Sequence, residues 1–333
     1  MITDPRPLQP EFVPGDVRHR AGEINALTTT LDPITVGDHA QPSLLYGPSG
    51  TGKTCIARYA VKRLHENVLA LDKQYINCWR DYTRFKTLYR ALDGLDHSVT
   101  IHRQSTPRDE LIDRLRDAVD DPYVVILDEV DQLEEKEVLY DLHDTPGLSL
   151  VLISNTDTEF FAGLEERIAS RLRSATRIRF DRYGTDELVS ILRDRVRWGL
   201  REDAVSDDML KVIAESAAGD ARVAIGTLLA AVQNGQQNGV DRLTRAEVEA
   251  AAPEAKEEIR RRNLEKLNAD QRILYDIVYE REAIRPDDLY EVYCEETEDP
   301  RTRRTIRNYL KKMRRYNLVK ATGEGKARRY CPV

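Results

Sequence analysis

Short, largely apolar runs alternate with longer amphipathic segments in the first half of the chain. The apolar runs lie at residues 43–46, 123–127 and 148–153, and further strands are expected within 68–77 and at 177–180. Consecutive apolar residues are typical of parallel strands that are buried on both faces. Helical spacing between these runs favours helices at 21–31, 55–61, 85–92 and 108–119. The alternation predicts an α/β domain with a parallel sheet flanked by helices.

After Thr185 the apolar positions recur at helical spacing. This predicts a small bundle, with helices at 188–198 and after Ser206, Asp220 and Thr244, followed by a charged helical connector at 253–267. The last segment favours helices from Asn268, from Pro286 and over 301–316, then strands at 318–322 and 326–330 about a 323–325 turn. Three helices and a hairpin are the winged-helix layout. We therefore expect a base domain at 1–182, a helical lid at 183–252, and a connector with a winged helix at 253–333.

Composition excludes several classes of protein. Hydrophobic residues make up 41% of the 333 residues, which is enough for real cores, and no apolar stretch approaches the roughly 18 residues of a membrane span. The four cysteines, at 55, 78, 294 and 331, form no C-x-x-C pair, and the first residues do not resemble a signal peptide. We expect reduced thiols in a cytoplasmic, nucleoid-associated protein, with no zinc site and no membrane partner.

Charge is distributed unevenly along the chain. The formal net charge is −7, yet residues 256–333 carry 20 Lys and Arg against 15 Asp and Glu. The last 33 residues hold 12 basic side chains and one acid, Glu324. A basic end on an acidic body suggests a polyanionic partner for that end. The acidic body itself is explained equally well by solubility or by adaptation to a salty cytoplasm.

Residues 47–54 match the phosphate-binding loop G-x-x-x-x-G-K-[ST] at every fixed position. The match lies between an expected strand and an expected helix, whose N-terminus would point at the phosphates. Lys53 would reach the outer phosphates of ATP or ADP, and the Thr54 hydroxyl would hold Mg²⁺. The expected nucleotide contacts are Gly47, Pro48, Ser49, Gly50, Thr51, Gly52, Lys53, Thr54 and Cys55.

Two carboxylates follow the apolar run 123–127, at the end of a strand where open α/β sheets place their ligands. Asp128 would orient the Mg²⁺ shell, and Glu129 would polarise the attacking water as a general base. Asn155 follows the next buried strand and is expected to contact the γ-phosphate or that water. Three arginines follow in residues 164–173, and they are either surface charges or the source of an arginine finger for a neighbouring subunit's ATP.

The helix expected at 301–316 separates apolar from basic side chains. Ile306, Tyr309, Leu310 and Met313 form one apolar stripe, and no acid occurs from 300 to 323. We expect this helix to enter the major groove of double-stranded DNA while the hairpin contacts the backbone or minor groove. The expected DNA contacts are Arg303, Arg304, Arg307, Lys311 and Arg314 on the helix and Lys326, Arg328 and Arg329 on the hairpin.

Taken together, these segments resemble one family: the archaeal initiator ATPases related to origin-recognition and cell-division-control proteins, which belong to the AAA+ class. The resemblance runs from about residue 10 to 333. It is carried by the segments Val17-Arg18-His19-Arg20, the loop at 47–54 as Walker A, Val124–Glu129 as Walker B, Ser170-Arg171-Leu172, Gly219-Asp220-Ala221-Arg222 and Thr305–Leu310.

The resemblance implies roles for individual residues. Val17 and Arg18 would lie beside the adenine, Asn155 would be sensor 1, and Arg222 of sensor 2 would contact the γ-phosphate. Arg171 is the expected arginine finger, with Arg167 as the alternative. Such initiators also carry a helical insertion that contacts DNA, in the place of residues 92–107. Those residues include Asp93, Asp96 and only one arginine, Arg103, which disfavours a DNA contact there.

The function that this resemblance implies is slow ATP hydrolysis coupled to binding of replication-origin DNA. Such a protein would help to load the replicative helicase and would self-associate on DNA. A second hypothesis is a DNA-binding regulator that uses ATP only as a ligand. A third is a clamp-loader or helicase-loader subunit, which the basic winged helix disfavours.

Overall fold

The computed structural model describes residues 1–68, 70–95 and 107–333, without the side chains of Arg108 and Lys326. Five parallel strands form a sheet in the order β2-β3-β4-β1-β5. They are β1 (Ser43–Tyr46), β2 (Asp72–Asn77), β3 (Tyr123–Asp128), β4 (Leu148–Ser154) and β5 (Thr176–Arg179). Every residue of β3 and β4 is buried, as their apolar runs predict. The predicted parallel sheet is confirmed.

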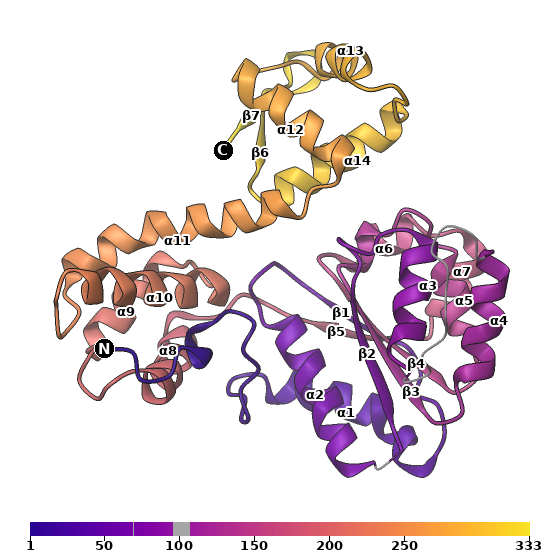
Figure 1. The fold of residues 1–333 in the computed structure, drawn as a ribbon, viewed down its shortest axis with the longest axis horizontal. Coiled ribbons are helices and arrows are strands. Elements are labelled where there is room, and N and C mark those ends of the chain that lie inside the picture. The colour runs from indigo at the N-terminus through magenta and orange to yellow at the C-terminus, as the bar shows by residue number, and fades with distance from the viewer. Residues whose placement is uncertain (69, 96–106) are drawn as a thin grey trace. The chain divides into compact units, whose positions relative to one another are not determined.

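Helices cover both faces of this sheet, as Figure 1 shows. One face packs against α1 (Ala21–Leu31) and α2 (Lys53–Asn67). The other packs against α3 (Arg84–Asp93), α4 (Arg108–Ala118), α5 (Val138–His143), α6 (Asp157–Ala162) and α7 (Glu166–Leu172). Because side chains alternate along each strand, neighbouring strand residues enter opposite cores. Leu127 joins the α3 side and Ile126 joins the α1 side.

The lid contains α8 (Thr185–Gly199), α9 (Asp207–Ser216) and α10 (Ala221–Gln237). The sequence predicts a fourth lid helix and a separate connector, but the structure has one continuous helix, α11 (Arg245–Glu265), with Pro253 inside it. A proline inside a helix costs one backbone hydrogen bond without necessarily ending the helix. The chain divides into two compact units, 1–252 and 253–333.

The first twelve residues form an N-terminal strap on the lid. Arg6–Leu8 form a short 3₁₀ helix (η1), and Leu8 is fully buried in the lid core. The buried Arg195 guanidinium donates hydrogen bonds to the carbonyl oxygens of Pro7 (2.7 Å) and Phe12 (3.2 Å). The strap is thus tied to α8 through its backbone.

The second unit holds α12 (Ala269–Arg281), α13 (Pro286–Glu296), α14 (Arg303–Arg315) and the antiparallel strands β6 (Val319–Thr322) and β7 (Arg329–Pro332). The predicted second strand, 326–330, was placed too early. Residues 325–327 form a 3₁₀ turn (η4), so the hairpin loop is longer than three residues. Asn317 ends α14 in a left-handed conformation with φ 53°.

Among the described residues, no helix is long and apolar enough to cross a membrane.

Candidate functional site

The phosphate loop joins β1 to α2 in the predicted order. Its backbone turns through left-handed conformations at Gly50 (φ 74°) and Gly52 (φ 93°), which residues other than glycine rarely adopt. Hydrogen bonding within α2 begins at the loop, since the Ile56 N–H donates to the Gly52 carbonyl (2.9 Å). The N–H groups of the first turn are therefore left available for an anion.

The lid docks directly on this loop. The Ala221 N–H donates to the Gly50 carbonyl oxygen (2.9 Å). Asp220 caps α10 by accepting from the N–H groups of Arg222 (2.9 Å) and Val223 (3.2 Å). A Cβ built on Gly50 would lie only 1.9 Å from Oδ1 of Asp220. Close packing of the loop against the cap thus places Arg222 in the first turn of α10, beside the loop.

Lys53 is 8% exposed and donates from Nζ to the carbonyl oxygens of Gly47 (2.6 Å) and Pro48 (2.7 Å). Burial lowers the pKa of Lys53 to about 8, against the opposing attraction of Asp128 and Glu129, and the nearby Arg222 lowers it further. The lysine, both carboxylates and the lid arginine therefore lie within electrostatic reach of one another. Phosphate oxygens would replace the two carbonyls as stronger, charged acceptors.

Thr54 and Asp128 meet although they are 74 residues apart, with Oγ1 donating to Oδ2 at 2.7 Å. A hydroxyl oxygen and a carboxylate are hard ligands that suit Mg²⁺, which is usually held by one or two protein groups together with substrate phosphates. No cluster of three His, Cys, Asp or Glu that could hold a metal occurs in the described residues, so an all-protein cage is not offered there. The donor set fits Mg²⁺ bound together with a nucleotide.

Sequence reasoning missed Tyr75, whose hydroxyl donates to the same Oδ2 of Asp128 at 2.8 Å. Parallel pairing aligns Asn77 with Asp128, so Tyr75 lies two residues earlier on the neighbouring strand. The signal was present as a tyrosine near the end of a predicted strand. Pairing of β2 with β3, however, could not be read from the sequence.

Glu129 and Asn155 follow β3 and β4, whose carboxyl ends lie at one edge of the sheet. Glu129 has a left-handed backbone, with φ 57° and ψ 44°, which is uncommon for a residue other than glycine and clusters at functional sites. Asn155 is half-buried. In the sheet, β4 lies between β3 and β1, which lead to Walker B and Walker A respectively. Asn155 therefore follows the strand that separates the two Walker segments.

The segment 17–20 lies between the N-terminal strap and α1. Val17 packs against the core formed with α1 and α2, whereas Arg18 pairs with Asp194 of the lid (3.0 Å). Sequence reasoning gave Arg20 no role. The buried Arg20 guanidinium donates to the Asp181 carbonyl (2.6 Å) and lies 4.2 Å from the Tyr183 ring centroid.

Cys55, another predicted nucleotide contact, is half-buried in α2, and burial raises the pKa of its thiol.

The two candidate arginine fingers share one aromatic partner. The guanidinium carbons of Arg167 and Arg171 lie 4.2 and 4.4 Å from the ring centroid of Tyr140 on α5. Arg171 is half-buried and also donates to the Tyr140 hydroxyl (3.4 Å), whereas Arg167 is exposed. The structure therefore brings both arginines to the α5–α7 surface.

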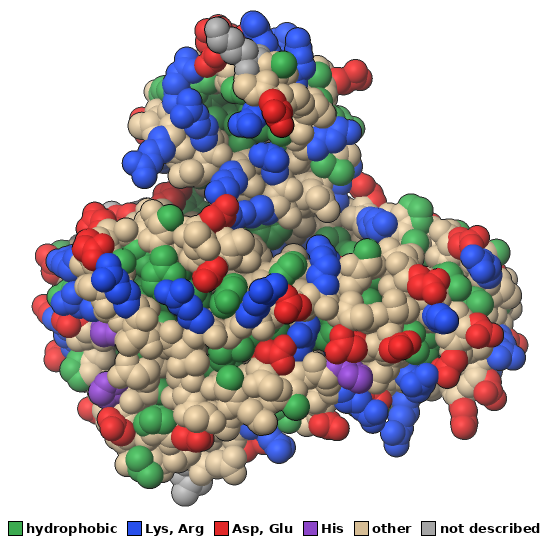
Figure 2. Space-filling model, turned by 180° about the vertical axis from the view of Figure 1, so that it is seen from behind, with side chains coloured by type: hydrophobic (Ala, Val, Ile, Leu, Met, Phe, Trp, Pro, Cys, Tyr) green, Lys and Arg blue, Asp and Glu red, His purple; other side chains and the backbone are tan. Residues whose placement is uncertain are grey.

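The predicted two faces of α14 are both present. Ile306, Tyr309, Leu310 and Met313 are buried, while Figure 2 shows Lys and Arg side chains over the unit 253–333. The predicted DNA contacts that the structure shows as exposed are Arg303, Arg304, Arg307, Lys311, Arg314, Arg328 and Arg329. Arg303 is partly neutralised, because it pairs with Asp287 (2.6 Å) and stacks on Tyr290 (4.4 Å).

One predicted DNA contact, the Lys326 side chain, falls outside the described part of the chain. So does most of the insertion at 92–107, where the sequence disfavours a DNA contact. Sequence reasoning also missed a hollow of about 430 Å³ at the end of α14, where Arg315 and Lys320 join Lys311 and Arg314.

Two family descriptions match the chain. An AAA ATPase domain matches residues 17–153, and a Cdc6 AAA+ ATPase-type lid domain matches residues 189–253. ORC1-type DNA replication protein 1 of Halobacterium salinarum is 51% identical over 308 residues, which cover 92% of this chain and 100% of the relative. ORC1-type DNA replication protein 9 of the same organism is 45% identical over 333 residues, covering 100% and 94%.

Solved structures show the same fold. The structure of the Aeropyrum pernix ORC1 protein in complex with DNA has a TM-score of 0.80 at 23% identity, covering 99% of this chain and 93% of that one. Cdc6p from Pyrobaculum aerophilum has a TM-score of 0.70 at 23% identity, covering 100% and 94%. The predicted AAA+ fold is confirmed.

Proposed function

The chain belongs to the family of ORC1-type DNA replication proteins, which are AAA+ ATPases, and we propose that it binds origin duplex DNA under the control of ATP. The proposal is carried by the occurrence of two features in one chain. One is a phosphate loop whose Thr54 contacts Asp128, and the other is the basic face of α14, a helix that contains no acidic residue. Loading of the replicative helicase is the expected consequence at an origin.

The nucleotide site would work through residues that already surround Lys53. Lys53 and Arg222 would neutralise the outer phosphates, with Val17 and Arg18 beside the base. Bound through Thr54 and Asp128, Mg²⁺ would supply charge stabilisation at the phosphates. Glu129 would accept a proton from the attacking water, and Asn155 would orient that water or the γ-phosphate. We expect slow hydrolysis, so that the ATP state lasts long enough to act as a signal.

Self-association on DNA would place Arg171 near a neighbour's nucleotide. In the single chain Arg171 is held by Tyr140, which suits a residue that acts only when a second subunit arrives. Arg167 stays the alternative because it stacks on the same ring and is more exposed.

Salt-series titration of DNA binding tests the proposed interface. A lost phosphate contact flattens the log–log salt slope by about one unit, whereas a bidentate guanine contact is worth about 1–3 kcal/mol of discrimination. We expect Arg307→Ala to weaken the preferred site more than random duplex, and Lys326→Ala to weaken both alike. Arg261→Ala is the control, because it removes an exposed charge of the connector helix. Equal effects of Arg307→Ala and Arg261→Ala would reject α14 as the DNA-binding element.

Genome-wide mapping of binding sites tests the replication role itself. Occupancy should concentrate at replication origins and should be lost in Lys53→Ala, which removes the cation expected on the outer phosphates. Occupancy at scattered promoters would favour the regulator hypothesis instead.

A further inference from the structure

Tyr75 contacts the carboxylate of Asp128, which is a proposed ligand of Mg²⁺. Its hydroxyl lies 2.8 Å from Oδ2 of Asp128, and the Thr54 hydroxyl lies 2.7 Å from the same atom. The two donors come from different elements: Tyr75 lies on β2, and Thr54 lies in the first turn of α2. Among the described residues, both side-chain donors to Asp128 therefore reach one oxygen, which fixes the rotation of the carboxylate about its last bond.

The tyrosine can only donate in this contact. An ionised carboxylate accepts hydrogen bonds and has none to give, so the contact at 2.8 Å requires the phenol to supply the proton. Asp128, which is 5% exposed, has little access to water that could take the place of this donor.

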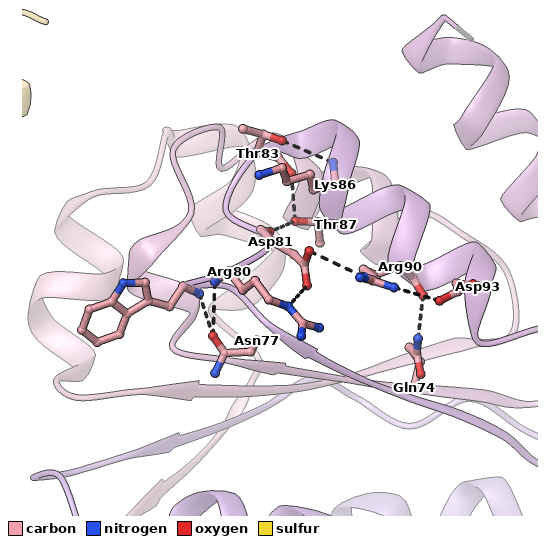
Figure 3. Close-up of polar contacts among 10 residues, drawn as sticks. Gln74, Asn77, Arg80, Asp81, Thr83, Lys86, Thr87, Arg90 and Asp93 are labelled. Carbon is pink, nitrogen blue, oxygen red and sulfur yellow. Dashed lines mark hydrogen bonds and ion pairs between the residues drawn. The ribbon is translucent and has the colours of Figure 1, made fainter. Parts of the chain in front are cut away.

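Two further contacts hold the tyrosine in place. The Arg58 guanidinium lies 5.2 Å from its ring centroid, and the ring packs against the core formed with α1 and α2. Asn77 ends the same strand, where it is the register partner of Asp128 on β3. The oxygen of Asn77 accepts from the backbone N–H groups of Trp79 (3.0 Å) and Arg80 (3.4 Å). Figure 3 shows this oxygen turned towards Arg80. The turn after β2 thereby orients the Asn77 amide.

We propose that Tyr75 is a positioning residue for Mg²⁺: it holds the Asp128 carboxylate in the orientation that the metal requires. This inference rests on the proposed nucleotide site. The Thr54 oxygen can accept the metal while its proton still donates to Asp128, so the two contacts are compatible with a loaded site. Outer-shell partners of this kind typically change metal affinity by about 10–100-fold when they are removed.

Tyr75→Phe is the test, because it deletes only the hydroxyl and keeps the ring that packs under Arg58. ATP affinity is measured in EDTA, and binding of Mn²⁺ to the protein–ATP complex is followed by electron paramagnetic resonance. We expect ATP affinity in EDTA to stay within about twofold of the wild type and the Mn²⁺ dissociation constant to rise about tenfold or more. Asp128→Asn shows how far the Mn²⁺ dissociation constant rises when the ligand carboxylate itself is lost.

Tyr123→Phe is the matched control. Its hydroxyl donates to the Ala91 carbonyl (2.5 Å) from the opposite end of β3, so the variant also loses a buried phenol hydrogen bond in the same sheet. We expect its Mn²⁺ affinity to equal that of the wild type. Unchanged Mn²⁺ affinity in Tyr75→Phe overturns the inference, as does an equal loss of ATP affinity with and without metal. If wild-type protein binds no ATP, the proposed function fails as well.

Discussion

Replacing Gly50 with alanine should separate the lid from the phosphate loop. The new Cβ would lie 1.9 Å from Oδ1 and 2.2 Å from Cγ of Asp220, so the capping carboxylate must move. That movement costs about 1 kcal/mol for the lost cap and about 1 kcal/mol for the backbone bond between Ala221 and Gly50. The left-handed backbone adds about 1–2 kcal/mol. The sum is a loss of about 3–4 kcal/mol in the free energy of unfolding.

Gly37→Ala isolates the backbone cost. Gly37 has φ 82°, close to the φ 74° of Gly50, and a Cβ there would meet nothing within 4 Å. This control should lose only about 1–2 kcal/mol. Steric displacement of Asp220 accounts for the remaining difference of about 2 kcal/mol, which corresponds to about 4–8 °C in Tm for a unit of this size.

Urea unfolding followed by tryptophan fluorescence measures both variants. The chain has two tryptophans, and they report separately on the base (Trp79) and the lid (Trp198). ATP affinity should fall in Gly50→Ala, because Arg222 moves with the cap, and should be unchanged in Gly37→Ala. If the two variants lose the same stability and both keep their ATP affinity, the contact between loop and lid contributes nothing and the reasoning is wrong.

Three further predictions concern the nucleotide site and the finger. Glu129→Gln should retain ATP binding while hydrolysis falls by about 10²-fold or more, and a parallel loss of affinity would exclude the role of base. Phosphate favours charged Lys53, whose pKa in the free protein is about 8, so ATP affinity in EDTA should decline as pH rises above 8. Lys53→Arg, which does not titrate there, should show no such decline. Arg171→Ala should lower hydrolysis only in protein assembled on DNA; a fall in the dilute monomer would assign Arg171 a role within its own subunit. Arg167→Ala, on the same Tyr140 ring, is the comparison.

The phosphate loop, the buried strands and the basic helix could be predicted because each signal is local. A glycine pattern, a run of apolar residues or a one-sided helix is complete within about fifteen positions, and backbone geometry links it directly to a structure. Lys53, Asp128 and the apolar stripe of α14 were identified in this way. Element ends were less certain: strand β7 begins at Arg329 because residues 325–327 close into a turn.

Only tertiary structure decided which of these segments meet. The sequence of β2 contains Tyr75, but its contact with Asp128 depends on β2 pairing with β3 in one register. Leu8 becomes part of the lid core although about 180 residues separate it from α8. Gly50 and Asp220, likewise distant in the chain, set each other's geometry at the junction of loop and lid. Such contacts join elements whose order in space is decided by the packing of whole faces, and no local pattern of residues records that order.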